Sequence, residues 1–226
     1  MNTRDALCSL FAAAGFVDAV MARAYASSPD EIFVEQLCRE GCRGAFGLID
    51  GEGALAQRFE GIVSLAQEMG LEGLKSEFED AFFGIGAKIH PYESVQASPE
   101  NMLFQHCTLE VRAAYRSLGL EAPHKANNPD DSLALELDFM QKALMSASDR
   151  LAENDVAACQ ASVGAARAFL DEHLGAWASK FASSFDGTRH EGGFYHAFSQ
   201  LMADAVAQEK AMLAQISPEL DDLLSE

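Results

Sequence analysis

Apolar residues recur every three or four positions along most of the chain, which is the period of an α-helix buried on one face. The clearest stripe holds Leu133, Leu137, Met140 and Leu144. The same spacing predicts helices over residues 3–25, 32–38, 54–69, 71–83, 98–118, 133–151, 156–174, an apolar continuation to 185, and a last long helix from 194. No segment alternates apolar and polar residues as a strand would. The pattern predicts one all-α domain, residues 1–226, of about eight to ten helices.

Capping residues mark where these helices begin. Pro129 fixes its own φ, so that Asp130 or Asp131 is predicted to cap the helix that carries the Leu133 stripe. Ser28, followed by proline and then Glu31, fits a capping box for the second helix. Ser98 before a proline is predicted to cap the fifth, and Asn154 or Asp155 is predicted to cap the helix over 156–174.

Glycine and proline divide the chain between the helices. The second helix is expected to fade near Gly41 and Gly44, with a loop over 47–53, and Gly70 is expected to end the third. Two longer connections, 84–98 and 119–130, lack a helical period. The first keeps apolar residues, and ordered loops of that kind are often functional, so both connections are predicted to be functional.

Charge and cysteine content narrow the function classes. With 16 Lys and Arg against 35 Asp and Glu, the net charge is −19, which argues against nucleic-acid binding and against an anionic membrane surface. Such acidity attracts basic partners, or only keeps the protein soluble. Five cysteines at scattered spacings favour a reducing compartment. Without a signal-peptide pattern, or a run near the roughly 18 apolar residues of a membrane helix, the sequence predicts a cytoplasmic protein.

Motifs for catalysis or metal binding are absent from the sequence. The six histidines lack helical ligand spacing, and Cys38 and Cys42, one turn apart, have no second pair to complete a site. There is no phosphate-binding Gly-x-x-x-x-Gly-Lys loop and no Gly-x-Ser-x-Gly elbow. His173, one turn from Trp177, is interpreted as a packed core histidine rather than a base. The sequence therefore predicts no enzyme activity, no cofactor and no metal.

A peptide groove is the remaining hypothesis from the residues themselves. Asp130 and Asp131 at a helix start, with Tyr92 and Glu93 in the first connection, offer carboxylates beside apolar surface. A peptide with Arg side chains and an apolar helix would suit such a groove. The alternative is that the two aspartates are only caps.

Three segments carry recognisable motifs: residues 90–95, residues 129–140, and residues 169–181 followed by Phe194 and Tyr195. Together they resemble the TorD/DmsD/NarJ family of redox-enzyme maturation chaperones. Residues 90–95, His-Pro-Tyr-Glu-Ser-Val, are similar to its Pro-Tyr/Trp-Glu-Ser-Val loop. Residues 129–140 are similar to its Pro-Asp-His-x-x-x-Glu-Leu-x-Phe-Met signature, and residues 169–181, followed by Phe194 and Tyr195, to its third signature. Order and spacing match from about residue 20 to 210. Asp131 stands where the family has His, and His90 where it usually has Pro.

The resemblance implies an all-α, non-enzymatic, cytoplasmic chaperone. Such a chaperone binds the twin-arginine signal peptide and the apo form of a molybdopterin oxidoreductase precursor until its cofactor is loaded. Carried over by position, the implied peptide-binding residues are Pro91, Tyr92, Glu93, Ser94, Asp130, Asp131 and Glu136. Because Asp131 makes the helix start more acidic, a client peptide at least as basic as usual is expected.

Several alternatives stay open. One is a NarJ-like role on a reductase subunit that is not exported, and another, from a different class, is a helical small-molecule-binding protein. The sequence does not decide between a monomer and a dimer, and it does not identify the client.

Overall fold

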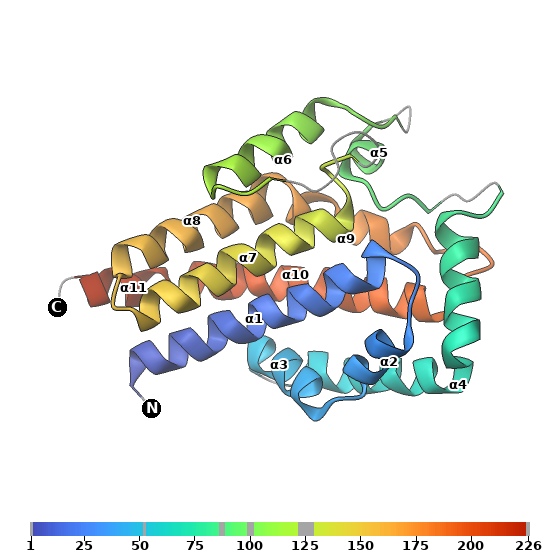
Figure 1. Ribbon diagram of the computed structural model, residues 1–226, viewed down its shortest axis with the longest axis horizontal. Coiled ribbons are helices and arrows are strands. Elements are labelled where there is room, and N and C mark those ends of the chain that lie inside the picture. Colours follow the sequence, from blue (N-terminus) through green and yellow to red (C-terminus); the bar gives the residue numbers. More distant parts are fainter. Residues whose placement is uncertain (1, 52, 86–88, 99–101, 122–128, 225–226) are drawn as a thin grey trace.

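The chain folds into packed helices joined by connections of unequal length (Figure 1). A computed structural model describes residues 2–51, 53–85, 89–98, 102–121 and 129–224. The helices in these ranges are α1 (Thr3–Ala26), α2 (Glu31–Leu37), α3 (Glu40–Asp50), α4 (Ala54–Phe82), α5 (Glu93–Ala97), α6 (His106–Ser117), α7 (Leu133–Ala152), α8 (Val156–Glu172), α9 (Leu174–Ser183), α10 (Phe194–Gln215) and α11 (Ser217–Leu224). No strand occurs in the described ranges, so the predicted all-α class is confirmed.

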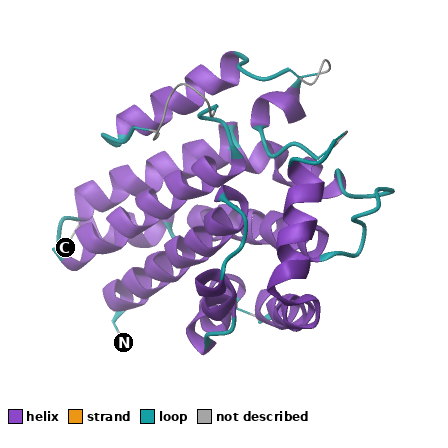
Figure 2. Ribbon diagram, turned by 45° about the vertical axis from the view of Figure 1, so that its right-hand side comes forward, coloured by secondary structure: helices purple, strands orange, loops and turns teal. Residues whose placement is uncertain are grey.

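Helices α1, α7 and α8 lie side by side, and α10 packs across α3, α4, α8 and α9 (Figure 1). Their apolar stripes form one continuous core, to which the predicted stripe of α7 contributes Leu133, Leu137, Met140 and Leu144, all fully buried. Helix α6 is different, because it lies along the outside of the bundle, above α7 and α8 (Figure 2).

Helix α1 is long and apolar enough to cross a membrane, by length and composition alone. The expectation that no run approaches such a length was therefore wrong. In the fold, this helix is a core element: Phe11, Val17 and Met21 are fully buried, and α1 packs along α7. Its apolar character is thus accounted for by packing inside the bundle.

Two carboxyl groups are enclosed between α1 and α10. Asp18 and Glu209 are both fully buried, and they face each other with no other hydrogen-bond partner among the described residues. Burial raises the pKa of Asp18 well above its ordinary value, and it raises the pKa of Glu209 to about 8. With pKa values raised this far, both carboxyl groups are held mainly in the protonated, uncharged form at neutral pH.

Several predicted helix boundaries were wrong. Helix α3 runs through Gly41 and Gly44 and over most of the expected 47–53 loop, because Phe46 and its apolar neighbours are buried. That burial outweighs a glycine cost of about 1 kcal/mol each. At the second helix, the cap is Asp30, which accepts the Phe33 N–H at 2.8 Å, and not Ser28.

The other differences concern helix ends. Gly70 (φ 65°, ψ 169°) breaks the helical backbone, as expected, but α4 continues beyond it to Phe82 after a kink. The predicted helix over 98–118 is shorter, because α6 begins at His106; the proline that follows Ser98 lies outside the described residues. The predicted cap at Asp155 is confirmed, since its carboxylate accepts the Ala158 N–H at 3.0 Å.

Candidate functional site

The two sequence segments singled out for peptide binding are joined in space. Tyr92 and Ser132 form an isolated antiparallel bridge. On either side of it, the Glu93 N–H donates to the Asp131 carbonyl at 3.0 Å, and the Leu133 N–H donates to the Pro91 carbonyl at 2.9 Å. We call this pairing of residues 91–94 with 130–133 the motif junction. It fixes the start of α5 against the start of α7.

Asp131 binds two other helices instead of capping its own. Its Oδ2 accepts the backbone N–H of Ser94, in the first turn of α5, at 2.8 Å. Its Oδ1 accepts the hydroxyl of Thr108, in the first turn of α6, at 2.7 Å. The N-cap of α7 is Ser132, which makes no side-chain cap bond, so the predicted cap was wrong. A carboxylate is nevertheless favourable here, because it meets the positive end of α5.

Asp130 also holds α6. Its carboxylate accepts the Arg112 Nε–H at 2.5 Å, and its carbonyl accepts the Tyr115 hydroxyl at 3.2 Å. The Tyr115 ring stacks on Phe139 of α7, with 5.4 Å between centroids. The Asp130 side chain is almost fully buried, so this ion pair is only partly open to solvent screening. Asp130 and Asp131 together anchor α6 to the motif junction.

Two buried glutamates connect the junction to the α8–α9 break. Glu136 is fully buried and accepts the Trp177 indole N–H at 2.9 Å. Burial, together with the nearby Glu93 carboxylate, raises the pKa of Glu136 well above its ordinary value. Oε2 of the second glutamate, Glu93, lies 3.1 Å from His173 Nδ1, within hydrogen-bond distance. None of the surface of Glu136 is exposed, so its carboxyl group lies inside the core.

His173 is packed in the core, as interpreted from the sequence, and it also pairs with a carboxylate. Burial alone would lower its pKa, but the hydrogen bond and charge of Glu93 outweigh burial, and the net pKa is raised. More distant charges from Glu110 and Glu172 act in the same direction. The backbone leaves the helical region at His173 (φ −126°, ψ −102°), which separates α8 from α9.

The seven residues expected to bind peptide are therefore close together but mostly enclosed. Five of them are buried, namely Glu93, Ser94, Asp130, Asp131 and Glu136. Pro91 and Tyr92 are partly exposed. In this arrangement the acidic members hold neighbouring helices, and a direct contact between them and a peptide stays a prediction.

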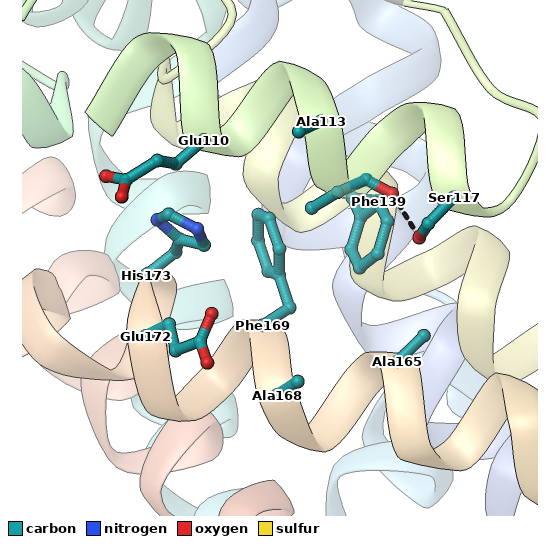
Figure 3. Close-up of a pocket in the computed structure, with 10 residues that line it drawn as sticks. Glu110, Ala113, Ser117, Phe139, Ala165, Ala168, Phe169, Glu172 and His173 are labelled. Carbon is teal, nitrogen blue, oxygen red and sulfur yellow. Dashed lines mark hydrogen bonds between the residues drawn. The ribbon is translucent and has the colours of Figure 1, made fainter. Parts of the chain in front are cut away.

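An open groove of about 490 Å³ lies next to the junction, between α6, α7 and α8. Phe139 and Phe169, whose ring centroids are 4.2 Å apart, form its floor (Figure 3). Its lining residues are Glu110, Ala113, Ala114, Ser117, Phe139, Ala165, Ala168, Phe169, Glu172 and His173. The sequence did not reveal this α6–α8 groove because three helices supply it at isolated positions. The available signal was a set of alanines on the outer faces of α6 and α8.

The groove is chemically asymmetric along its length. At one end Glu110 and Glu172 lie on either side of His173, and Ser117, Phe139 and Ala165 lie towards the other (Figure 3). No group of three or more His, Cys, Asp or Glu side chains within the described residues is arranged to hold a metal ion. The geometry suits an apolar ligand that carries positive charge at one end.

Comparison with known proteins places this architecture in a family. Residues 51–183, more than half of the chain, match the family model described as nitrate reductase delta subunit. The chain belongs to this family. Among curated proteins, it is 25% identical over 142 residues to the chaperone protein TorD of Aliivibrio fischeri, and 28% identical over 123 residues to that of Photobacterium profundum.

These alignments cover 62% and 54% of this chain, and 64% and 55% of the two relatives. The chain thus matches less than two thirds of either relative's length. The resemblance to the TorD-type chaperones seen in the sequence motifs is confirmed. The matched region contains the motif junction and all of the groove-lining residues.

Proposed function

We propose that this protein, a member of the nitrate reductase delta subunit family, is a redox-enzyme maturation chaperone. Its client is the precursor of a molybdopterin oxidoreductase, recognised through its twin-arginine signal peptide and its apo form before export. The observation that carries the proposal is the α6–α8 groove, which is open and apolar and has one wall fixed by the two family motifs. A signal peptide, with a basic start and an apolar helical stretch, has the complementary chemistry.

The buried residues of the motif junction, and Glu136 beside it, support this site by holding other side chains and helices in place. Asp130 and Asp131 set the height of α6 above α8 through Arg112 and Thr108, and so set the width of the groove. Glu93 fixes His173, which lines the acidic end. Glu136 accepts the bond that fixes Trp177, and the Ser94 N–H donates the bond that orients α5. Pro91 and Tyr92, which are partly exposed, provide the edge at which a longer peptide or the client itself would make contact.

The proposed activity is binding without catalysis, in the cytoplasm, where a precursor awaiting export is found. It requires no bound cofactor, because the groove supplies apolar surface and carboxylates directly. The acidic surface of the chaperone, with its net charge of −19, favours encounter with a basic peptide.

A groove-filling variant tests this function. A fluorescently labelled twin-arginine peptide is titrated with the protein, and anisotropy reports the affinity. We expect Ala168→Trp, which places a large ring over the Phe169 floor, to weaken binding by at least roughly tenfold. Ala161→Trp is the matched control, because Ala161 is exposed on the same helix and does not line the groove.

Equal peptide affinities for the Ala168→Trp and Ala161→Trp variants would show that the peptide does not bind in the groove. If wild-type protein binds no signal peptide of any candidate oxidoreductase, and its deletion leaves every molybdoenzyme active, the chaperone assignment itself is refuted.

A NarJ-like role is a second candidate, favoured by the family description, which names a nitrate reductase subunit. In that case the client keeps no cleavable signal peptide. Affinity purification from native cells discriminates the two, because the captured oxidoreductase either carries a twin-arginine leader or lacks one. A small molecule found in the groove by native mass spectrometry would instead support the ligand-binding alternative.

A further inference from the structure

The acidic end of the α6–α8 groove is formed by two helices facing each other. Glu110 belongs to α6 and Glu172 is the last residue of α8, and both side chains are exposed. Figure 3 shows their carboxylates on opposite sides of the His173 ring. Because the two acids are far apart in the sequence and one stands on each wall, their convergence is produced by the fold.

These carboxylates are the charged groups of the groove that a ligand can reach. None of the ten lining residues is Lys or Arg. Two nearby arginines are engaged elsewhere: Arg112 binds Asp130, and Arg167 binds the Ser217 hydroxyl at 2.5 Å. The imidazole of His173 is paired with the Glu93 carboxylate behind the groove, so its charge is compensated within the junction. Glu110 lies 3.1 Å from the exposed His106, a partner that solvent can replace.

We propose that Glu110 and Glu172 select a pair of neighbouring basic side chains, and that they fix the direction in which the peptide lies. The proposal rests on the chaperone function proposed above and identifies the residues of the site that recognise the charge of the peptide. Each wall offers one carboxylate, so two guanidinium groups can be held at once, and arginine is preferred to lysine because its planar fork binds a carboxylate through two hydrogen bonds.

The direction follows from the asymmetry of the groove. In a signal peptide the basic residues precede the apolar stretch. With the basic pair beside Glu110 and Glu172, the apolar helix runs over Phe169 and Phe139 towards Ser117 and contacts this floor every three or four residues. The positive N-terminal end of the bound helix then also faces the two carboxylates, which favours the same direction.

Neutralising the two acids tests the selection. We measure affinity for peptides that share one apolar stretch and begin with Arg-Arg, Lys-Lys or Gln-Gln. Glu110→Gln and Glu172→Gln are each expected to weaken Arg-Arg binding by roughly three- to tenfold, and the double variant by roughly tenfold or more. The double variant should bind all three peptides alike, and its affinity should depend less on salt than that of the wild type.

A matched control separates local recognition from overall charge. The Glu35→Gln/Glu68→Gln variant removes the same two charges at exposed positions on α2 and α4. We expect it to keep the preference for Arg-Arg. If it loses as much affinity as the Glu110/Glu172 pair, attraction is only long-range and the proposal is wrong.

Cross-linking tests the direction. A photo-reactive group at the N-terminal end of the peptide should label residues near Glu172, and one at the C-terminal end should label residues near Ser117. The reverse pattern would refute the proposed direction. If Ala168→Trp abolishes binding while the Glu→Gln double variant binds as the wild type does, the groove and the proposed function stand and the charge-reading role fails. Absence of binding to wild-type protein would refute both.

Discussion

Asp131 is buried and accepts two hydrogen bonds from two different helices, so its removal should release both at once. We predict that Asp131→Ala destabilises the fold, because the Ser94 N–H and the Thr108 hydroxyl then lose their acceptor. Hydrogen bonds to a charged group contribute about 1.5–3 kcal/mol each. Two of them give about 3–6 kcal/mol, from which the cost of burying the carboxylate is subtracted, and we expect a net loss of about 2–4 kcal/mol in the free energy of unfolding.

Asp131→Asn should cost much less. The amide oxygen can accept the Ser94 N–H, and the Thr108 hydroxyl can rotate and accept from the amide nitrogen, so no group is left unsatisfied. We expect a loss of about 1 kcal/mol. Asp138→Ala serves as the control, because Asp138 forms a part-exposed i,i+4 pair with Lys142 on α7, and such pairs contribute about 0.3–0.5 kcal/mol.

Urea unfolding measures all three variants. Far-UV circular dichroism follows the helices, and the fluorescence of Trp177, the single tryptophan of the chain, follows the core beside Glu136. The reasoning is refuted if Asp131→Ala is no less stable than Asp138→Ala, or if Asp131→Asn loses as much stability as Asp131→Ala.

Two further predictions concern groups outside the groove. The pKa of Glu209 is about 8 in the fold against 4.5 in the unfolded chain, and the pKa of Asp18 is also raised. The contribution of this pair to stability should therefore be largest below about pH 4 and should fall as the pH rises towards and past 8. Calorimetric melting from pH 5 to 9 should show a shallower fall in melting temperature for Glu209→Gln than for the wild type, and an unchanged slope would contradict the prediction. A Cβ at Gly193 would lie 2.3 Å from Glu77 Oε1, which accepts a backbone N–H at the start of α10, so Gly193→Ala should lower the free energy of unfolding by about 1–3 kcal/mol. The control Gly61→Ala, on the open face of α4, should be neutral or stabilising. Urea titration measures both variants, and equal stability would refute the steric argument.

The helical period predicted the fold well because burial of one face is what holds these helices. The stripe of α7 and the cap at Asp155 follow from residues close together in the sequence, and both are present. Helix α3 shows the limit of local reasoning, because the cost of its glycines was visible in the sequence and the burial of Phe46 was not.

The site was only partly predictable for the same reason. The motifs identified the two segments that meet at Tyr92 and Ser132, yet the capping role predicted for Asp131 at α7 was wrong because its partners come from other helices. Caps were inferred from the nearest helix start, and a cap supplied by a residue far along the chain leaves no local pattern. The groove was harder still to predict from the sequence, because Phe139 and Phe169 form its floor only in the folded arrangement of α6, α7 and α8.

The packing of α1 against α7 has a consequence for how the protein is made. The N-terminal helix is apolar enough to enter a membrane, and the helix that covers it ends at Ala152, more than a hundred residues later. At a synthesis rate of roughly 5–20 residues per second, the face of α1 that packs on α7 stays uncovered for several seconds. Asp18, in the middle of that helix, then carries its charge in water and makes insertion into a bilayer unfavourable. The same carboxyl that is buried with Glu209 in the finished protein would thus discourage the nascent chain from entering a membrane.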